Sequence, residues 1–252
     1  LIYLNGRPSE YLKRNNEISF FEAGSDPYTL SGARMPGFWS AVLGMNLEQV
    51  LKSYDPVVTG RNRIAGLPVQ VVRLAPKDPS KYGFVLWLEQ ASGLLLRLDL
   101  IDEGGNLVEQ FMGVDLRIMP EPSSWLLALD KVTLPRAVTT EQAYQAPQQE
   151  LGWAPGWLPK GFRVMSTDRH PLVGTGEMVD YMMVSDGLVD VSIYLSAPES
   201  GMGEQLVRQG ATSLLRLLND HKVEVTVVGE VPAQTAQRIA ESLHSLAKGV
   251  RP

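Results

Sequence analysis

The segment YGFVLWLEQASGLLLRLDLIDEGGN, residues 82–106, constrains the fold more than any other part of the chain. Its apolar residues recur with a period of two, which predicts strands over about 83–90 and 94–101. Seven large apolar side chains then share one face: Phe84, Leu86, Leu88, Leu94, Leu96, Leu98 and Leu100. Burying one such side chain is worth about 1.5–3 kcal/mol, whereas a whole domain is stable by only about 5–15 kcal/mol. Some other group must therefore cover this face.

The chain offers its own cover just upstream of these strands. The segment RMPGFWSAVLGM (34–45) is apolar and broken by Gly and Pro, and NLEQVLKSYDP (46–56) predicts a short helix capped by Asn46. We expect both to lie over the apolar face in the resting state. Because an irregular segment opens at lower cost than a regular helix, an acyl chain could replace it. The further candidates for lining such a lipid cavity are Phe38, Trp39, Val42 and Leu43.

Further strands are predicted around this hairpin, over 16–24, 57–64, 67–75 and 107–119. The last three complete an antiparallel meander, in which turns such as AG and EGGN supply residues suited to positive φ. This pattern indicates a large β-rich domain over residues 1–120. The opening LIYLNGRPSEYL lacks an initiator Met and a signal pattern. We therefore expect the given sequence to start inside that domain, without its first strands and signal peptide.

A second, smaller α+β domain is predicted over residues 153–252. The alternation in 177–197 indicates a hairpin that turns at Asp186-Gly187, and helices are predicted over 203–221 and 232–249. Residues 121–152 are rich in Pro and polar side chains, which favours a linker containing one short helix within 123–131. The segment WAPGWLPKGF (153–162) either docks the two domains together or packs into the smaller core.

Composition argues against several classes of function. The net charge is −5, with 23 Lys and Arg against 28 Asp and Glu, which disfavours a broad nucleic-acid footprint. The chain has no cysteine, and its three histidines fit no metal-binding spacing. We interpret the carboxylates at 99, 102, 103 and 109 as solvating a hairpin, because catalytic carboxylates need a partly desolvated cleft. We thus predict no catalytic residue, no metal site and no cofactor; a hydrolase would have to assemble its site from scattered loops.

Four segments carry a resemblance to a known family: RIAGLPVQVVRLAPKD, YGFVLWLEQASGLLLRLDLIDEGGNLVEQF, WLPKGF and VVGEVPAQTAQRIAESL. They resemble the MucB/RseB family of periplasmic regulators of the envelope-stress sigma factor, over nearly the whole chain. The resemblance implies an α+β fold, with a curved antiparallel sheet in the large N-terminal domain. That sheet is similar to the half-barrel of LolA/LolB lipoprotein carriers and has covering helices.

The same resemblance implies a regulatory role in the periplasm. Such a protein binds the periplasmic part of a transmembrane anti-sigma factor of the RseA/MucA type and shields it from a site-one protease of the DegS type. Lipopolysaccharide or another acyl lipid then loosens the complex. A periplasmic lipid or lipoprotein carrier is the alternative, although it would not require the second domain. The sequence leaves open a homo-oligomer, the lipid species and the residues that contact the partner.

Overall fold

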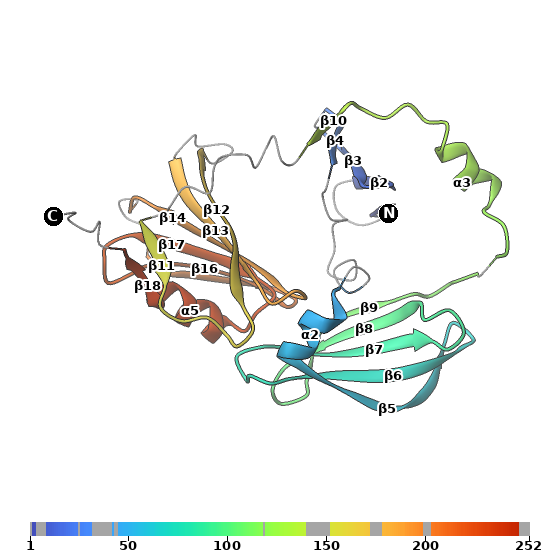
Figure 1. The fold of residues 1–252 in the computed structure, drawn as a ribbon, viewed down its shortest axis with the longest axis horizontal. Coiled ribbons are helices and arrows are strands. Elements are labelled where there is room, and N and C mark those ends of the chain that lie inside the picture. The colour runs from blue at the N-terminus through green and yellow to red at the C-terminus, as the bar shows by residue number, and fades with distance from the viewer. Residues whose placement is uncertain are drawn as a thin grey trace. The chain divides into compact units, whose positions relative to one another are not determined.

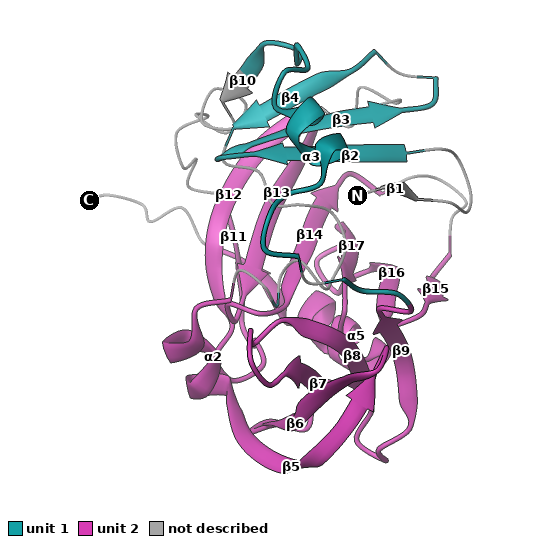
Figure 2. Ribbon diagram, turned by 90° about the vertical axis from the view of Figure 1, so that its right-hand side faces the viewer, with its two compact units in different colours: residues 1–44, 115–147 teal, residues 45–114, 148–252 magenta. Residues whose placement is uncertain are grey.

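A computed structural model of the chain describes residues 2–3, 9–24, 26–31, 42, 45–117, 119–139, 152–171, 178–198 and 203–246. The chain divides into two compact units, Leu1–Gly44 with Asp115–Pro147 and Met45–Val114 with Gln148–Pro252 (Figure 2). In the described ranges, both consist mainly of antiparallel sheet with a few short helices (Figure 1). The predicted α+β class is confirmed. The predicted domain boundaries at 1–120, 121–152 and 153–252 stay predictions.

The first unit is built on a five-stranded sheet in the order β1-β2-β3-β4-β10, in which only the β10–β4 pair is parallel. Helix α3 follows Ser123, whose hydroxyl accepts a hydrogen bond from the Leu126 N–H. The strand predicted within 16–24 and the helix predicted within 123–131 are both confirmed. The elements of this unit are β1 (Ile2–Tyr3), β2 (Ser9–Arg14), β3 (Glu17–Glu22), β4 (Tyr28–Ser31), α3 (Ser124–Leu129) and β10 (Ala137–Thr139).

The second unit begins with the predicted meander, a five-stranded antiparallel sheet in sequential order. The predicted helix before it is confirmed, because the Asn46 side chain accepts a hydrogen bond from the Gln49 N–H at 3.2 Å. The fifth strand is shorter than predicted and ends at Met112. The N–H of the next residue, Gly113, donates a hydrogen bond to the Leu96 carbonyl at 2.8 Å. The elements are α2 (Leu47–Ser53), β5 (Tyr54–Ile64), β6 (Leu67–Pro76), β7 (Gly83–Glu89), β8 (Leu95–Ile101) and β9 (Leu107–Met112).

A six-stranded antiparallel sheet in the order β12-β13-β14-β17-β16-β15 forms the rest of this unit, together with helix α5 and a two-stranded ribbon. The predicted hairpin turning at Asp186-Gly187 is confirmed, with Gly187 at φ +92°. The elements are β11 (Trp153–Pro155), β12 (Arg163–Pro171), β13 (Met178–Ser185), β14 (Asp190–Ser196), β15 (Gln205–Gln209), β16 (Thr212–Leu218), β17 (Glu224–Gly229), α5 (Ala233–Ser242) and β18 (Leu243–Ser245).

Two helix predictions in this part of the chain need correction. The helix predicted over 203–221 is wrong, because β15 and β16 form a hairpin there, with Gly210 at φ +58° in the turn. Leu215 and Leu217 are buried while Leu214 and Leu218 are exposed, which is the period of a strand and not of a helix. The helix predicted over 232–249 ends early, at Ser242, because β18 then pairs with β11. No helix within the described ranges is long and apolar enough to cross a membrane.

Candidate functional site

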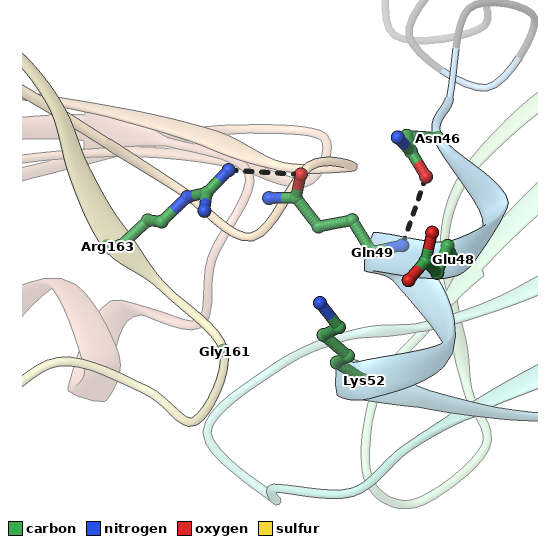
Figure 3. Close-up of a pocket in the computed structure, with 6 residues that line it drawn as sticks. All are labelled: Asn46, Glu48, Gln49, Lys52, Gly161 and Arg163. Atoms are coloured by element: carbon green, nitrogen blue, oxygen red, sulfur yellow. Dashed lines mark hydrogen bonds between the residues drawn. The ribbon is translucent and has the colours of Figure 1, made fainter.

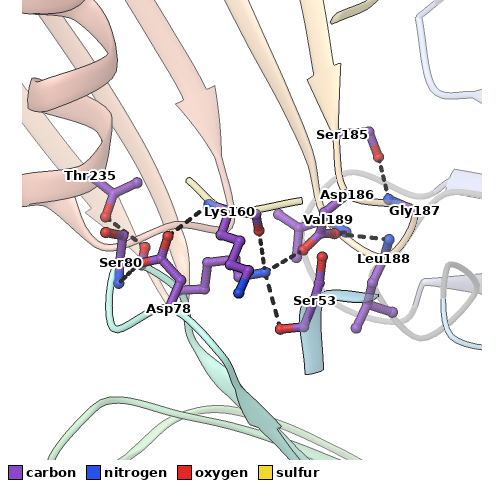
Figure 4. A network of polar contacts seen from close by, with 11 residues as sticks. Ser53, Asp78, Ser80, Lys160, Ser185, Asp186, Gly187, Leu188, Val189 and Thr235 are labelled. Atoms are coloured by element: carbon purple, nitrogen blue, oxygen red, sulfur yellow. Dashed lines mark hydrogen bonds and ion pairs between the residues drawn. The ribbon is translucent and has the colours of Figure 1, made fainter. Parts of the chain in front are cut away.

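A buried lysine in the β6–β7 loop joins the two larger sheets of the second unit. Lys81 Nζ lies 3.1 Å from Asp186 Oδ2, and the two side chains are only 1% and 0% exposed. The same ammonium group donates to the carbonyl oxygens of Lys160 at 3.0 Å and Ser53 at 3.4 Å (Figure 4). One charge thus bonds to the end of α2, to the segment before β12 and to the β13–β14 turn. We call this set the Lys81 network.

The turn that presents Asp186 is fixed by the same carboxylate. Its Oδ1 accepts hydrogen bonds from the N–H groups of Leu188 and Val189 at 3.1 and 3.0 Å. This leaves Oδ2 for Lys81. A carboxylate with both oxygens bonded and its charge paired is the arrangement that makes a buried ion pair tolerable. The Asp186-Gly187 turn therefore does more than reverse the chain, because it also positions a counter-ion.

Aromatic rings complete the surroundings of the buried ammonium group. Lys81 Nζ lies 4.4 Å from the ring centroid of Tyr54 and 5.9 Å from that of Phe162. Burial lowers the pKa of Lys81, and the Asp186 carboxylate opposes that shift. Burial, followed by the charge of Asp186, raises the pKa of Tyr54 well above its ordinary value. This environment surrounds the buried ammonium group with a counter-ion, carbonyl oxygens and aromatic rings.

Two further hydrogen bonds connect the same two sheets. The Lys160 N–H donates to Asp78 Oδ2 at 2.7 Å, and the Thr235 hydroxyl donates to the Ser80 carbonyl at 2.6 Å. Burial alone would raise the pKa of Asp78, but hydrogen bonds from Lys160 and Ser80 outweigh it and hold the pKa below its usual value. Residues 153–162 make contacts of both predicted kinds: Lys160 bonds to the β6–β7 loop, whereas Trp153–Pro155 pair with β18 and Gly156 bonds to Ser242.

A shallow polar pocket of about 320 Å³ lies beside the network (Figure 3). Within it the Arg163 guanidinium donates to Gln49 Oε1 at 3.3 Å. Gly161 has φ +92°, and a Cβ added there would overlap the Ser53 hydroxyl, so only glycine permits this close approach. The pocket is lined by Asn46, Glu48, Gln49, Lys52, Gly161 and Arg163.

The predicted lipid-cavity residues fall into three groups. Cross-strand pairing aligns Phe84 with Leu100 and Leu86 with Leu98, and the Tyr54 ring packs on Phe84 with centroids 5.5 Å apart. The buried group comprises Phe84, Leu86, Leu96, Leu98, Leu100 and Val42. By contrast, Leu88 is half-buried and Leu94 is 37% exposed. The remaining candidates, Phe38, Trp39 and Leu43, lie outside the described residues.

The apolar face continues to the two edges of the β5–β9 sheet, where it is open. Val58 of β5 pairs with Val72, which in turn pairs with Leu86, and Val58 is 68% exposed. On the other side Phe111 of β9 pairs with Leu98 and is 38% exposed. The centre of the face is thus covered, while apolar side chains remain accessible along both outer strands.

The interpretation of the carboxylates at 99–109 as hairpin solvation is wrong for Asp99. This residue is 6% exposed and accepts two hydrogen bonds from Arg97, at 2.8 and 2.6 Å, and the Arg97 guanidinium lies 4.3 Å from the Trp87 ring. The i, i+2 spacing of Arg97 and Asp99 on one strand face was the sequence signal for this pair. Glu109 has a separate role, because its Oε2 accepts the Ala211 N–H at 2.9 Å in the β15–β16 turn.

Within the described part of the chain, no cluster of three or more His, Asp or Glu side chains could hold a metal ion. His170 instead pairs with Asp168, with Nδ1 and Oδ2 3.1 Å apart. The contact region between the two larger sheets, which we call the junction, consists of aromatic rings, an ion pair and hydrogen bonds to the backbone. Such an arrangement can fix the geometry of a binding surface.

Comparison with known proteins agrees with this description. The family models for the MucB/RseB N-terminal and C-terminal domains match residues 1–138 and 147–244. The chain is 32% identical over 244 residues to the sigma-E factor regulatory protein RseB of Escherichia coli (strain K12), covering 96% of this chain and 76% of that protein. It is also 32% identical over 199 residues to the sigma factor AlgU regulatory protein MucB of Pseudomonas aeruginosa, covering 77% of this chain and 62% of MucB.

Solved structures show the same two-domain fold. A crystal structure of MucB in complex with MucA(peri) matches with a TM-score of 0.67 at 25% identity, over 96% of this chain and 88% of that one. The complex structure of Pseudomonas aeruginosa MucA/MucB matches with a TM-score of 0.69, also at 25% identity and with the same coverage. The agreement of both domain models, in order and over most of the sequence, leads to one conclusion. The chain belongs to the MucB/RseB family.

Proposed function

We propose that this chain is a periplasmic, non-enzymatic negative regulator of an envelope-stress sigma factor, and that it binds the periplasmic part of a membrane anti-sigma factor. The observation that carries the proposal is the match, over 96% of the chain, to MucB in complex with MucA(peri). The relatives described as regulators of sigma-E and AlgU support it, because they are regulatory proteins. The Lys81 network supports it as well, since it joins two sheets through contacts suited to hold a binding surface.

Regulation in this proposal works by covering the partner. While the anti-sigma segment is bound, a site-one protease of the DegS type cannot reach its cleavage site. A surface that spans both sheets of the second unit keeps its shape only while their junction holds. Separating a buried ion pair such as Lys81–Asp186 costs several kcal/mol, so the junction resists opening.

An acyl lipid, such as the lipid A part of lipopolysaccharide, releases the partner. The buried leucine face of the β5–β9 sheet supports this step, because its edges remain open at Val58 and Phe111. Exposed apolar side chains next to a covered apolar face give an acyl chain a place of first contact. An acyl chain that enters there would replace the groups that now cover the leucine face. The net change in free energy would be small, since one apolar group takes the place of another.

A protease-protection assay tests the proposal. The periplasmic domain of MucA serves as substrate for a DegS-type protease, with and without the full chain, and lipid A is then titrated in. We expect the chain to slow cleavage saturably and lipid A to restore it, whereas deacylated lipopolysaccharide should leave protection intact. Unchanged cleavage in the presence of excess chain would rule out the regulatory function.

The buried leucine face also favours a second candidate, a lipid or lipoprotein carrier, because such a carrier needs an apolar surface that it can expose. A carrier would take up lipid A in the same assay but would give no saturable binding to the MucA periplasmic domain. Binding of the MucA periplasmic domain therefore distinguishes the two functions, whereas binding of lipid A does not.

A further inference from the structure

A second pocket lies where the two larger sheets of the second unit meet, and it is larger than the pocket that contains Gln49 and Arg163. Its volume is about 630 Å³, and its walls come from the β6–β7 loop, the β8–β9 turn, strand β15 and the start of α5. Two arginines, Arg208 of β15 and Arg238 of α5, line it together with Tyr82 and Trp157. The six-stranded sheet and α5 thus bring two positive charges to a cavity whose other walls come from loops of the β5–β9 sheet.

Arg208 and Arg238 are exposed residues, and the guanidinium group of each makes one contact with a pocket side chain. Arg238 lies over the face of Trp157, with 4.0 Å between its Cζ and the ring centroid, and Arg208 donates to the Tyr82 hydroxyl at 3.5 Å. Among the described residues, no carboxylate lies within ion-pair distance of either arginine. Stacking on a ring uses the face of a guanidinium and leaves the N–H donors in its plane available. Both arginines are therefore prepared to bind an anion.

The start of α5 adds positive potential to the same wall. This ten-residue helix begins after Pro232, which makes no side-chain capping bond, and its first turn carries no acidic residue. The uncapped N-terminus of a helix bears about half a positive charge. Thr235 lines the pocket in this first turn and is fixed by its bond to the Ser80 carbonyl. The helix dipole and both arginines thus favour the same sign of ligand.

The opposite wall limits how much negative charge the pocket can accept. Asp102 and Glu103 of the β8–β9 turn line it. Asp102 is occupied by hydrogen bonds from Asn106 at 2.8–3.1 Å, while Glu103 is exposed and makes no such bond. A single carboxylate can bind on the arginine side and avoid this wall. A phosphate dianion carries about twice the charge and would be repelled more strongly.

We propose that this pocket binds a carboxylate side chain of the anti-sigma segment, with Arg208 and Arg238 as its anchors. The inference rests on the proposed function for the identity of the protein partner. The planar guanidinium groups match the two oxygens of a carboxylate, and such charge-assisted bonds are about twice as strong as neutral ones. The pocket walls come from both sheets, and the Lys81 network holds these sheets together. Binding of a side chain in the pocket therefore depends on that network.

Binding of labelled MucA periplasmic domain to the full chain, followed by fluorescence anisotropy, tests the proposal. We expect Arg208→Gln/Arg238→Gln to raise the Kd about tenfold or more, since the variant loses both charge-assisted hydrogen bonds to the carboxylate. The matched control Arg61→Gln/Arg73→Gln removes two exposed arginines from β5 and β6 and should change the Kd less than about twofold. Arg238→Lys keeps the charge but loses the planar fork, so its effect should lie between these two.

Competition and a second probe make each failure distinguishable. Acetate, which carries a single carboxylate, should displace the MucA domain better than inorganic phosphate, and the reverse order would overturn the carboxylate assignment. If the MucA domain binds wild type, pocket variant and control alike, the pocket proposal fails and the proposed function stands. If wild type does not bind MucA, the proposed function fails and a labelled Ala-Glu-Ala peptide with blocked ends, which carries one carboxylate, replaces it as probe. Binding of this peptide that depends on both pocket arginines would then support the pocket, and its absence would overturn it.

Discussion

Lys81 and Asp186 are 105 residues apart in the chain and meet as an ion pair with no appreciable contact with solvent. Burying two charges is costly, and the attraction between them offsets that cost only where hydrogen bonds satisfy the remaining donors and acceptors. Here the carbonyls of Ser53 and Lys160 and the turn amides of residues 188 and 189 supply those bonds. We infer that the pair determines how the two sheets are positioned against each other more than it adds to the free energy of unfolding.

Removing the charge of Asp186 should destabilise the second unit strongly. Asp186→Asn retains Oδ1 as an acceptor for the turn amides but leaves the Lys81 ammonium group buried and unpaired. We expect a loss of about 3–5 kcal/mol in urea unfolding followed by circular dichroism. Asp55→Asn is the control, because Asp55 pairs with Lys77 at 3.2 Å but is 66% exposed, and it should cost less than about 1 kcal/mol. Equal losses would contradict a special role for the buried pair.

Gly161→Ala should separate backbone strain from a close approach between elements. Gly161 and Gly66 both have positive φ, +92° and +79°, so an alanine at either position costs about 1–2 kcal/mol. A Cβ at Gly161 would also overlap Ser53, whereas none of the described atoms lies within 4 Å of a Cβ at Gly66. We expect Gly161→Ala to cost about 1–3 kcal/mol more than Gly66→Ala in the same urea titration. Equal costs would mean that Ser53 moves aside freely.

The leucine face should respond to truncation according to burial. Leu98 is 0% exposed at the centre of the β5–β9 sheet, and Leu98→Ala should cost about 2–5 kcal/mol. Leu94, at 37% exposure, serves as the control, and Leu94→Ala should cost about 1 kcal/mol or less. Thermal unfolding of both variants measures the difference. If Leu98→Ala loses little stability, the groups that cover Leu98 are loosely packed. In that case the variant should bind lipid A as tightly as wild type.

Local patterns were sufficient to predict the meander and its turns. The alternation in 83–101 fixes strand period, and the AG turn matches the positive φ of Ala65 and Gly66. The Asn46 cap and the Asp186-Gly187 turn are likewise determined by neighbours within four residues. These features are predictable because the energy that selects each one comes from adjacent residues.

The rest could not be predicted because it depends on distant residues. The leucines of 203–221 fit a helical stripe, but alternate burial of Ser213, Leu215 and Leu217 against neighbouring strands selects a hairpin. Lys81 and Asp186, or Arg208 and Tyr82, meet only after both sheets have formed. No spacing along the chain encodes such pairs, so the junction and its arginine pocket emerge only from the structure.

Glu230→Gln should alter the dependence of stability on pH. Burial raises the pKa of Glu230, its own backbone N–H opposes this, and the nearby carboxylates Glu109 and Asp190 raise it further. A folded-state pKa above the unfolded value means that the contribution of Glu230 to stability is complete below about pH 4.3. It is lost as the pH rises through the folded-state pKa, because the charged form is disfavoured in the fold.

Glutamine mimics the protonated carboxyl, so Glu230→Gln and wild type should share a Tm near pH 4. At pH 7.5 the variant should melt higher by about 2–4 °C, which corresponds to about 1 kcal/mol in a chain of this size. Differential scanning fluorimetry across this range measures the gap between the two Tm values. The control Glu121→Gln removes an exposed charge and should leave that gap near zero at every pH. A variant that melts below wild type at pH 7.5 would show that the Glu230 carboxylate is stabilised by a cation, and not disfavoured by burial and like charges.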